Sequence, residues 1–189
     1  MSGYQILRVE KVKSAGALAA ASKHNRRERE TPNADRSLLG ENTHIGLSST
    51  EEVLGGMREI HSGLAKAPRK DSVLAGQFVV TASPEKMNEM TRAMQDKYFA
   101  SALDWIKERH GSQNVLAATI HRDEKTPHMH VLFVPVTDRN TLSFKEFYGG
   151  RQNLRNLQTE FHQRVSKQFG MDRGIERSGA HHQSVRRWY

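Results

Sequence analysis

The chain has 189 residues, no cysteine and a formal net charge of +8. Its contents of 36% hydrophobic and 26% charged residues are ordinary for a globular protein, and the absence of cysteine excludes disulfides and any zinc or thiol chemistry based on that residue. The basic excess favours a polyanionic partner, most commonly nucleic acid. No apolar run is long enough for a signal peptide or a membrane span, so we expect a cytoplasmic protein with no membrane contact from this domain.

Hydrophobic patterning predicts the secondary structure in chain order. Segments rich in β-branched and aliphatic residues are expected to be strands: 4–12, 73–82, 114–121 and 128–136. Apolar residues at helical spacing predict helices over 16–30, 50–66, 84–110 and 151–169. Turn formers dominate 31–48, which we expect to be a long loop. Strands joined by hairpins or long helices indicate an α+β fold on a largely antiparallel sheet, with residues 1–189 as a single domain.

Two of the predicted helices have recognisable ends and an apolar face. Ser14 is the expected N-cap of the first helix, while Ser83 and Gly111 bound the helix over 84–110. The residues expected to face the core from that helix and from the last one are Met87, Met90, Met94, Phe99, Leu103, Ile106, Leu154, Leu157, Phe161, Val165 and Phe169. A methionine stripe of this kind is more typical of a core than of a cofactor site.

Three of the ten histidines lie within one segment, HRDEKTPHMH, at residues 121–130. Side chains alternate across a strand, so His128 and His130 point to the same face. His121 ends the odd-numbered series of the preceding strand, which includes Val115, Ala117 and Thr119. If that series shares the face, the three imidazoles converge and can hold a divalent metal with open coordination positions. The alternative is three solvated or separately hydrogen-bonded histidines.

Further polar residues lie near this hairpin or on the first helix. Asp123 and Glu124 occupy the connecting turn, and Glu124 is the better candidate for a role at a metal, through water or by orienting a ligand. A plain turn carboxylate is the alternative. Helical spacing places Ala17, His24 and Arg27 on one face, although an isolated helical histidine is more often a surface residue than a catalytic one.

Residues 121–130 resemble the H-x-D-E-x-T-P-H-M-H signature of the catalytic domain of Mob/Pre (MobV-type) plasmid mobilisation relaxases, which belong to the endonucleases with a His-hydrophobic-His motif. Residues 23–29, KHNRRER, are similar to the N-terminal motif of that family. Residues 69–73, followed by 79–83, resemble a third family segment. The loop over 31–48 matches only loosely, and the resemblance gives no role to His44.

The resemblance implies a five-stranded antiparallel palm flanked by helices, as in relaxases and rolling-circle initiators. It implies a divalent metal, Mn²⁺ or Mg²⁺, at His121, His128 and His130, with His24 as the nucleophile. Glu124, singled out by its place in the turn, is the further candidate catalytic residue. The implied activity is nicking of single-stranded or hairpin DNA at an origin of transfer, in a bacterial protein encoded by a plasmid or mobile element. Other relaxosome or coupling proteins are implied partners. Family members usually continue beyond this module, so an end at Tyr189 is compatible with a domain excised from a longer chain.

The residues themselves agree in part with this reading and leave alternatives open. A cation on neutral ligands keeps its full charge for a scissile phosphate, but imidazoles would also suit Zn²⁺. Such ligands would protonate near pH 6.5, so metal affinity is expected to fall there. The expected phosphate contacts are Arg26, Arg27, Arg69 and Lys70. The competing functions are a rolling-circle initiator with a tyrosine nucleophile (Tyr4, Tyr98, Tyr148 or Tyr189) and a non-catalytic, metal-stabilised DNA-binding protein.

Overall fold

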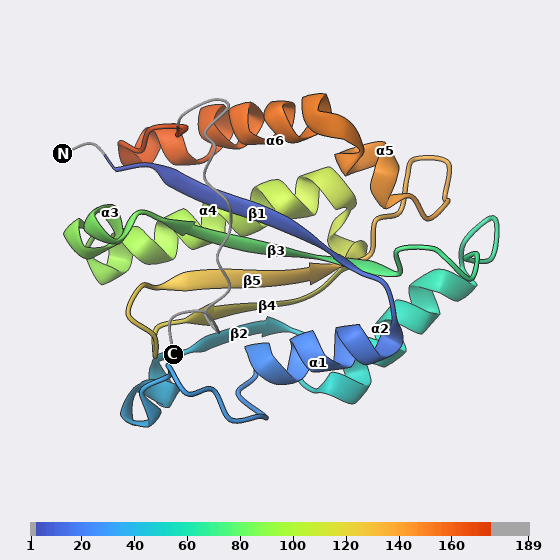
Figure 1. The fold of residues 1–189 in the computed structure, drawn as a ribbon, viewed down its shortest axis with the longest axis horizontal. Coiled ribbons are helices and arrows are strands. Elements are labelled where there is room, and N and C mark those ends of the chain that lie inside the picture. Colours follow the sequence, from blue (N-terminus) through green and yellow to red (C-terminus); the bar gives the residue numbers. More distant parts are fainter. Residues whose placement is uncertain (1–2, 175–189) are drawn as a thin grey trace.

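The computed structural model describes residues 3–174, in which strands pair into one antiparallel sheet (Figure 1). Its strands are β1 (Gln5–Val12), β2 (Thr43–Gly46), β3 (Ala75–Ala82), β4 (Val115–His121) and β5 (His128–Phe133). They follow the order β1-β3-β5-β4-β2, so the hairpin of β4 and β5 lies inside the sheet and β1 and β2 form its edges. This arrangement confirms the predicted α+β class with a five-stranded antiparallel palm.

Helices connect these strands and pack on both faces of the sheet. They are α1 (Ala15–Asn25), α2 (Thr50–Ser62), α3 (Pro84–Glu89), α4 (Arg92–His110), α5 (Phe144–Tyr148) and α6 (Gly150–Arg164), with the short 3₁₀ segments η1 (Arg36–Glu41), η2 (Ser112–Asn114) and η3 (Ser166–Phe169). Ser14 caps α1 as expected, because its Oγ accepts from the amide of Ala17 at 3.1 Å. Within residues 3–174, no helix is both long and apolar enough to cross a membrane.

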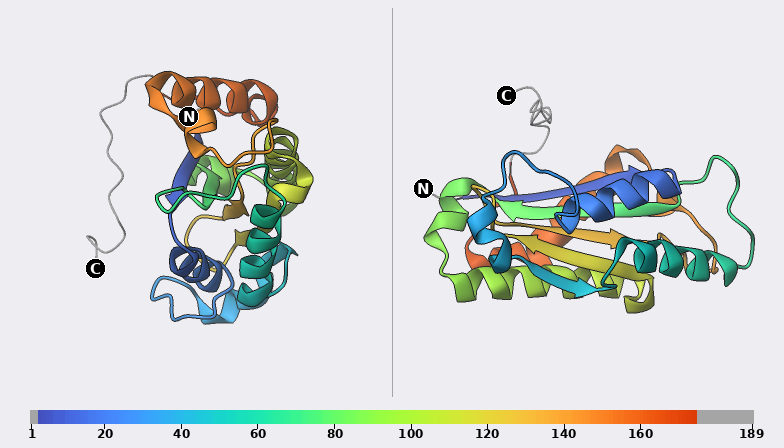
Figure 2. Two further views of the ribbon diagram at one scale, coloured as in Figure 1. Left: turned by 90° about the vertical axis from the view of Figure 1, so that its right-hand side faces the viewer. Right: turned by 90° about the horizontal axis from the view of Figure 1, so that it is seen from below.

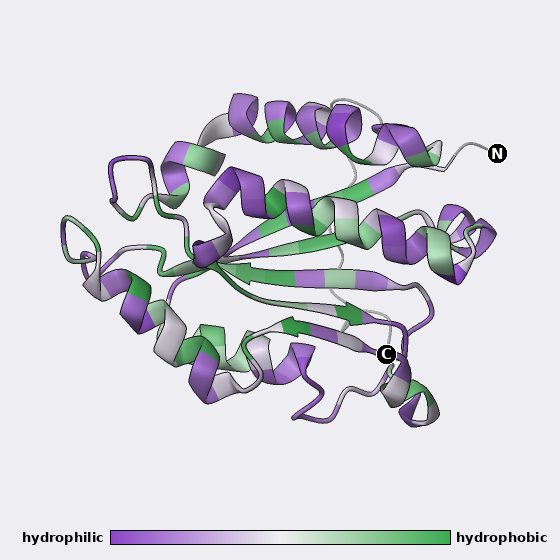
Figure 3. Cartoon of the chain, turned by 180° about the vertical axis from the view of Figure 1, so that it is seen from behind, coloured by the Kyte–Doolittle hydropathy of each residue, from purple (hydrophilic) through white to green (hydrophobic). Residues whose placement is uncertain are grey.

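The alternation of side chains along the strands divides the core in two. On one face, Phe78, Val80 and Val131 pack with aromatic and aliphatic residues of α4 and α6. On the other, Leu132 packs with Leu18 of α1 and with residues of α2. The sheet therefore lies between α6 and the α1–α2 pair (Figure 2). The outer helices alternate hydrophilic and hydrophobic segments, as helices with one buried side must (Figure 3).

The expected loop over 31–48 contains two regular elements, so that prediction is wrong in part. Residues Thr43–Gly46 form β2, which pairs with β4 from Ala117 to Ile120. Such a short strand carries too little alternation to stand out among turn formers, and its partner is far away in the sequence. The short helix α5 was likewise not predicted.

The long helix expected over 84–110 is two helices. The chain is extended at Met90, and Thr91 then caps α4 by accepting from the amide of Met94 at 3.3 Å. The break rotates the apolar face, so Met94 is 42% exposed although the stripe predicted it to be buried. Leu154 of α6, also expected inside, is 42% exposed as well.

The first helix ends at Asn25, earlier than the expected 30. The amide of Arg27 donates to the carbonyl of His24 at 3.1 Å, and the amide of Glu28 donates to the carbonyl of Lys23 at 2.9 Å. Together with the left-handed backbone of Arg27, at φ 58°, this is the Schellman pattern that terminates helices. Glycine is the usual residue in that conformation, and an arginine is held there at some cost in backbone strain.

Candidate active site and metal centre

Three imidazoles meet at one end of the β4–β5 hairpin. His121 is the last residue of β4 and pairs directly with His128, the first residue of β5, while Thr119 pairs with His130. The ring centroids of the three histidines are 5.0 Å apart in every pair. The alternation therefore predicts their convergence correctly. The odd-numbered series does break at Val115, where a bulge turns that side chain to the α4 face.

Hydrogen bonds to backbone carbonyls occupy one ring nitrogen of His121 and one of His128, and the remaining nitrogens of these two rings face each other. His121 Nε2 lies 2.7 Å from the carbonyl oxygen of Asn25, and His128 Nδ1 lies 2.9 Å from that of Thr126. A carbonyl can only accept, so these two nitrogens carry the protons, and the lone pairs are on His121 Nδ1 and His128 Nε2. Those two nitrogens are 3.2 Å apart. Backbone carbonyls commonly fix metal-binding histidines in this manner.

The third imidazole supplies the strongest sign that a cation fits. His130 is 8% exposed, and neither of its ring nitrogens has a hydrogen-bond partner among residues 3–174. A buried polar group without a partner is costly, and a metal ligand is one physical reason to keep it. Among residues 3–174, two sets of donors lie close enough to share an ion: His24, His121 and His130, and His121, Glu124 and His128. Neither set contains all three hairpin histidines.

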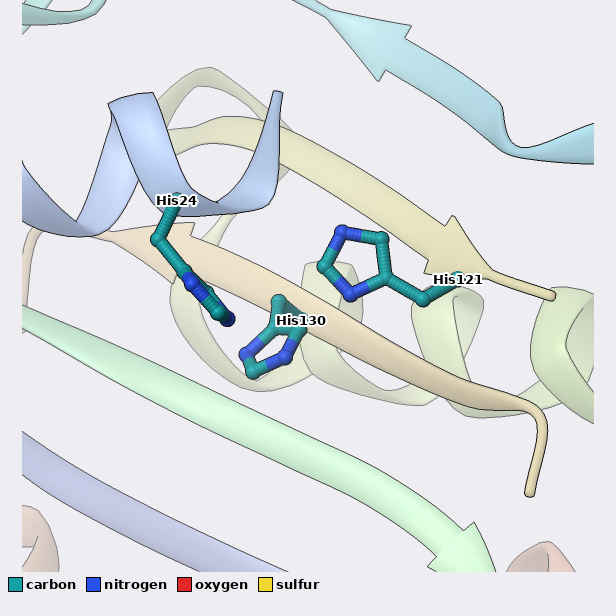
Figure 4. Close-up of side chains that lie close together, drawn as sticks. All are labelled: His24, His121 and His130. Atoms are coloured by element: carbon teal, nitrogen blue, oxygen red, sulfur yellow. The ribbon is translucent and has the colours of Figure 1, made fainter. Parts of the chain in front are cut away.

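His24 reaches the cluster from the last turn of α1. Its ring centroid lies 5.9 Å from that of His121 and 5.8 Å from that of His130. Figure 4 shows its imidazole directed from the helix toward the two strands. The sequence predicted His24 and Arg27 on one helical face, but the helix has already ended at Arg27. What brings both residues to the site is the Schellman turn.

Arg27 joins α1 to the turn between the two histidine strands. Its guanidinium donates to both carboxylate oxygens of Asp123, each at 2.7 Å, and to Glu124 Oε1 at 2.6 Å. The side chains of Arg27 and Asp123 are 7% and 0% exposed. Asn33 Nδ2 donates to the other oxygen of Glu124 at 2.5 Å. Glu124 Oε1 is 3.9 Å from His128 Nε2, so this carboxylate is held beside the imidazole of His128.

Burial favours the neutral form of His121 and His130. It lowers the pKa of His121 to about 3 and holds the pKa of His130 well below its usual range, where the neighbouring imidazoles add to the effect. Burial also lowers the pKa of His24, followed by the charge of Arg27, while Glu124 raises it. For Asp123, burial would raise the pKa, but hydrogen bonds from Arg27 and Asn42 outweigh it and lower the pKa to about 2. Neutral imidazoles beside fixed carboxylates suit both metal ligation and nucleophilic attack.

Not every residue singled out by the sequence lies at this cluster. Arg26 is near it but pairs with Glu28 at 3.1 Å. Arg69 and Lys70 are exposed in the loop before β3, at the opposite end of the sheet from the histidines (Figure 1). Their contact with DNA, like that of Arg26, stays a prediction. His44 of β2 shares the histidine face of the sheet, and its Nδ1 lies 3.2 Å from Thr119 Oγ1.

The tyrosines considered as alternative nucleophiles are not at the cluster. Tyr98 and Tyr148 are 0% and 5% exposed in the core on the other face of the sheet. Tyr4 is exposed at the start of β1, and Tyr189 lies outside the described residues.

Sequence reasoning missed several residues that build the site. Asn25 and Thr126 act through backbone carbonyls, which no side-chain pattern reveals. Asn33 lies in the loop that was expected to be irregular. The sequence favoured Glu124 over Asp123 as a candidate, although Asp123 is the more deeply buried partner of Arg27.

A five-stranded antiparallel palm with a histidine cluster at the end of its central hairpin, joined by a histidine from the first helix, is the architecture of a relaxase-type domain. Residues 1–189 match the family model described as plasmid recombination enzyme, and the chain belongs to that family.

Individual relatives agree with this assignment. A plasmid recombination enzyme of Bacillus thuringiensis is 43% identical over 62% of this chain and 26% of its own length. A 65 kDa protein of Zymomonas mobilis is 32% identical over 100% of this chain and 33% of its own. The chain thus spans a third or less of the length of these two relatives.

Solved structures of the MobM relaxase domain bound to origin-of-transfer DNA of plasmid pMV158 share the fold. One, Mn-bound at pH 5.5, is 27% identical with a TM-score of 0.88, covering 98% of this chain and 97% of the other. Another, Mn-bound at pH 4.6, is 26% identical with a TM-score of 0.87, covering 98% of each chain.

Proposed function

We propose that this chain is a relaxase domain that nicks one strand of DNA at a plasmid origin of transfer, with His24 as the nucleophile and a divalent metal at His121, His128 and His130. The observation that carries the proposal is the position of His24, whose imidazole faces two of the three hairpin histidines at less than 6 Å between ring centroids. A cation there and a nucleophile beside it can act on the same phosphate.

The relatives support the substrate and the cofactor. MobM relaxase domains are bound to origin-of-transfer DNA and are Mn-bound, in one case at pH 4.6. Unperturbed imidazoles would be protonated at that pH, so a site of buried, neutral histidines like this one fits such binding. The net charge of +8 fits a DNA partner. Whether the ion of this chain is Mn²⁺ or Mg²⁺ is part of the test.

The proposed chemistry uses the neutral imidazole of His24. One ring nitrogen attacks the scissile phosphorus, a P–N bond forms, and the bond from phosphorus to the 3′ oxygen breaks. The imidazole gives up its remaining ring proton and the 3′ oxygen gains one, so one product ends in a 3′ hydroxyl. The other keeps its 5′ phosphate on His24. Attack by a later 3′ hydroxyl reverses these changes and reseals a strand.

The other side chains bind and orient. A bound divalent ion would supply positive charge to the phosphate oxygens in the transition state. Arg27 lies next to His24, where Asp123 and Glu124 fix its guanidinium and offset its charge. Glu124 also lies beside His128, so it can orient that ligand. Asn25 orients His121 through its carbonyl.

The test is incubation of the chain with supercoiled plasmid carrying the cognate origin, with Mn²⁺, with Mg²⁺ and with chelator. Nicking should require a divalent ion, and His24→Ala should bind DNA without forming an adduct. A P–N bond should survive alkali and decay in mild acid, and peptide mapping should place the nucleotide on residues 23–27.

His61→Ala is the matched control, because this half-buried histidine of α2 hydrogen-bonds to the carbonyl of Leu74, at 3.0 Å, and not to the histidine cluster. It should nick normally. An adduct on Tyr4, Tyr98 or Tyr148 would replace this proposal by the tyrosine mechanism. Metal-dependent DNA binding without any cleavage would replace it by a binding protein.

A further inference from the structure

A cavity of about 400 Å³ opens between the end of α1 and η1, next to the site. Three arginines line it, Arg27, Arg29 and Arg36, together with Leu39 and neighbouring residues of 28–34. Its volume is within the range of about 300–1,000 Å³ that small-molecule pockets span, so it can take a single nucleotide. Arg27 lines the cavity and also donates a hydrogen bond to Glu124. The cavity and the histidine cluster therefore border each other at Arg27.

The loop that forms the cavity is tied to the turn between the histidine strands. The amide of Asp35 donates to the carbonyl of Asp123 at 2.6 Å, and Asn33 Nδ2 donates to Glu124 at 2.5 Å. Asp35 then caps η1 through its contact with the amide of Ser37 at 2.9 Å. These bonds fix the position of the cavity relative to His24.

The cavity has nearly balanced charges and one apolar side chain. Glu28 and Glu30 also line it, and Glu28 pairs with Arg26 at 3.1 Å. Arg27 is neutralised by two carboxylates, and Arg36 pairs with Glu30 at 3.3 Å. The side chain of Arg29 has no ion-pair partner among residues 3–174. Leu39, which lines the cavity, is 42% exposed and so leaves apolar surface open to a ligand. A nucleotide offers the complement of both features, an anionic phosphate for the guanidinium and a base face for the leucine.

We infer that this cavity, which we call the Arg29–Leu39 pocket, binds the nucleotide that follows the scissile phosphate on the nicked strand. The inference rests on the proposed function. In an in-line displacement the departing 3′ oxygen, and the nucleotide that carries it, lie on the side of phosphorus away from His24. The Arg29–Leu39 pocket lies next to His24, because Arg27 lines the pocket and its guanidinium also donates to the carbonyl of His24 at 3.5 Å. The nucleotide whose 5′ phosphate becomes joined to His24 is the one that can enter it.

The test uses oligonucleotides spanning the nick once its position has been mapped on plasmid, bound to the wild-type chain in chelator. 2-Aminopurine replaces either the first base after the scissile phosphate or the first base before it. Binding should raise the emission of the following base, because it leaves its stack. Leu39→Ala should abolish that rise. Leu154→Ala is the matched control, since Leu154 is also 42% exposed but lies on α6, and it should leave the emission unchanged.

The charged wall is tested separately. Arg29→Ala should weaken oligonucleotide binding by about tenfold and reduce the salt dependence by about one phosphate contact. Arg151→Ala, an exposed arginine of α6, should do neither.

The two proposals fail in different ways. Nicking by wild type, combined with Leu39→Ala and Arg29→Ala variants that behave like their controls, overturns the Arg29–Leu39 pocket and leaves the relaxase function standing. A rise at the preceding base alone overturns the pocket as well. Wild type that neither binds the oligonucleotide nor nicks plasmid overturns both.

Discussion

Metal binding by this chain should depend on pH much less steeply than binding by three ordinary histidines. A histidine must be neutral to ligate a cation. With an ordinary pKa of about 6.5, the neutral fraction falls from roughly 0.9 at pH 7.5 to roughly 0.03 at pH 5.0, which is about thirtyfold for each ligand. Three such ligands would lower the affinity by about 10⁴.

Two of the three proposed ligands, His121 and His130, escape that loss. The pKa of His121 is lowered to about 3 and that of His130 lies well below its usual range, so both stay neutral in the folded chain at pH 5. With two of the three factors removed, the affinity for Mn²⁺ should fall by no more than about thirtyfold, or about 2 kcal/mol instead of about 6. This replaces the expectation, drawn from the sequence, of a steep fall near pH 6.5.

The assay is titration of the chain with Mn²⁺ at pH 7.5 and 5.0, with free Mn²⁺ followed by electron paramagnetic resonance. Because the folded pKa values lie below the unfolded value of 6.5, each buried neutral histidine also destabilises the metal-free fold as the pH falls, by about 2 kcal/mol at pH 5. Circular dichroism must therefore show that the chain is folded at both pH values. His130→Ala should lose the site, and His61→Ala should keep it. A thousandfold fall in folded wild type would refute the reasoning.

Three further outcomes follow from the same geometry. Asp123→Asn should destabilise the fold by about 2.5 kcal/mol, the equivalent of lowering its pKa from 3.8 to about 2, and reduce the melting temperature by roughly 5–10 °C. That contribution is complete above pH 4 and lost only as the pH falls toward 2, so the difference in stability from wild type should be equal at pH 6 and 8. The exposed Asp71→Asn is the control. A difference in stability that changes between those pH values would contradict the assignment. Arg26→Ala should reduce the salt dependence of DNA binding with little effect on stability, because its side chain is partly exposed; an unchanged slope would remove it from the DNA footprint. Thr91→Ala should cost about 1 kcal/mol by removing the cap of α4, measured by urea denaturation, whereas equal stability would mean that the break between α3 and α4 does not depend on this cap.

The hairpin histidines could be predicted because everything that places them is local. Two strands, a short turn and the alternation of side chains suffice to bring His121, His128 and His130 together. The strand β2 could not be predicted in the same way. It has only four residues, and its hydrogen bonds go to β4, more than seventy positions along the chain.

The position of His24 could be predicted only in part. Its resemblance to a family motif singled it out, but helical spacing alone gave the wrong reason why His24 and Arg27 lie at the same site. The helix end depends on a left-handed arginine, which propensity disfavours and which the ion pairs with Asp123 and Glu124 hold in place. Those partners are 96 and 97 positions away, so no local pattern contains them.

The separation of the site into an early segment and a late hairpin also bears on how the protein is made. On the ribosome, His24 emerges long before His128, and β1 and β2 each pair only with strands that follow them. A nascent chain that stops before residue 128 lacks two of the three hairpin histidines and the strand that fills the centre of the sheet. The proposed strand cleavage therefore requires synthesis through β5, the last strand of the palm, and chains that terminate before residue 128 lack two of the three proposed metal ligands.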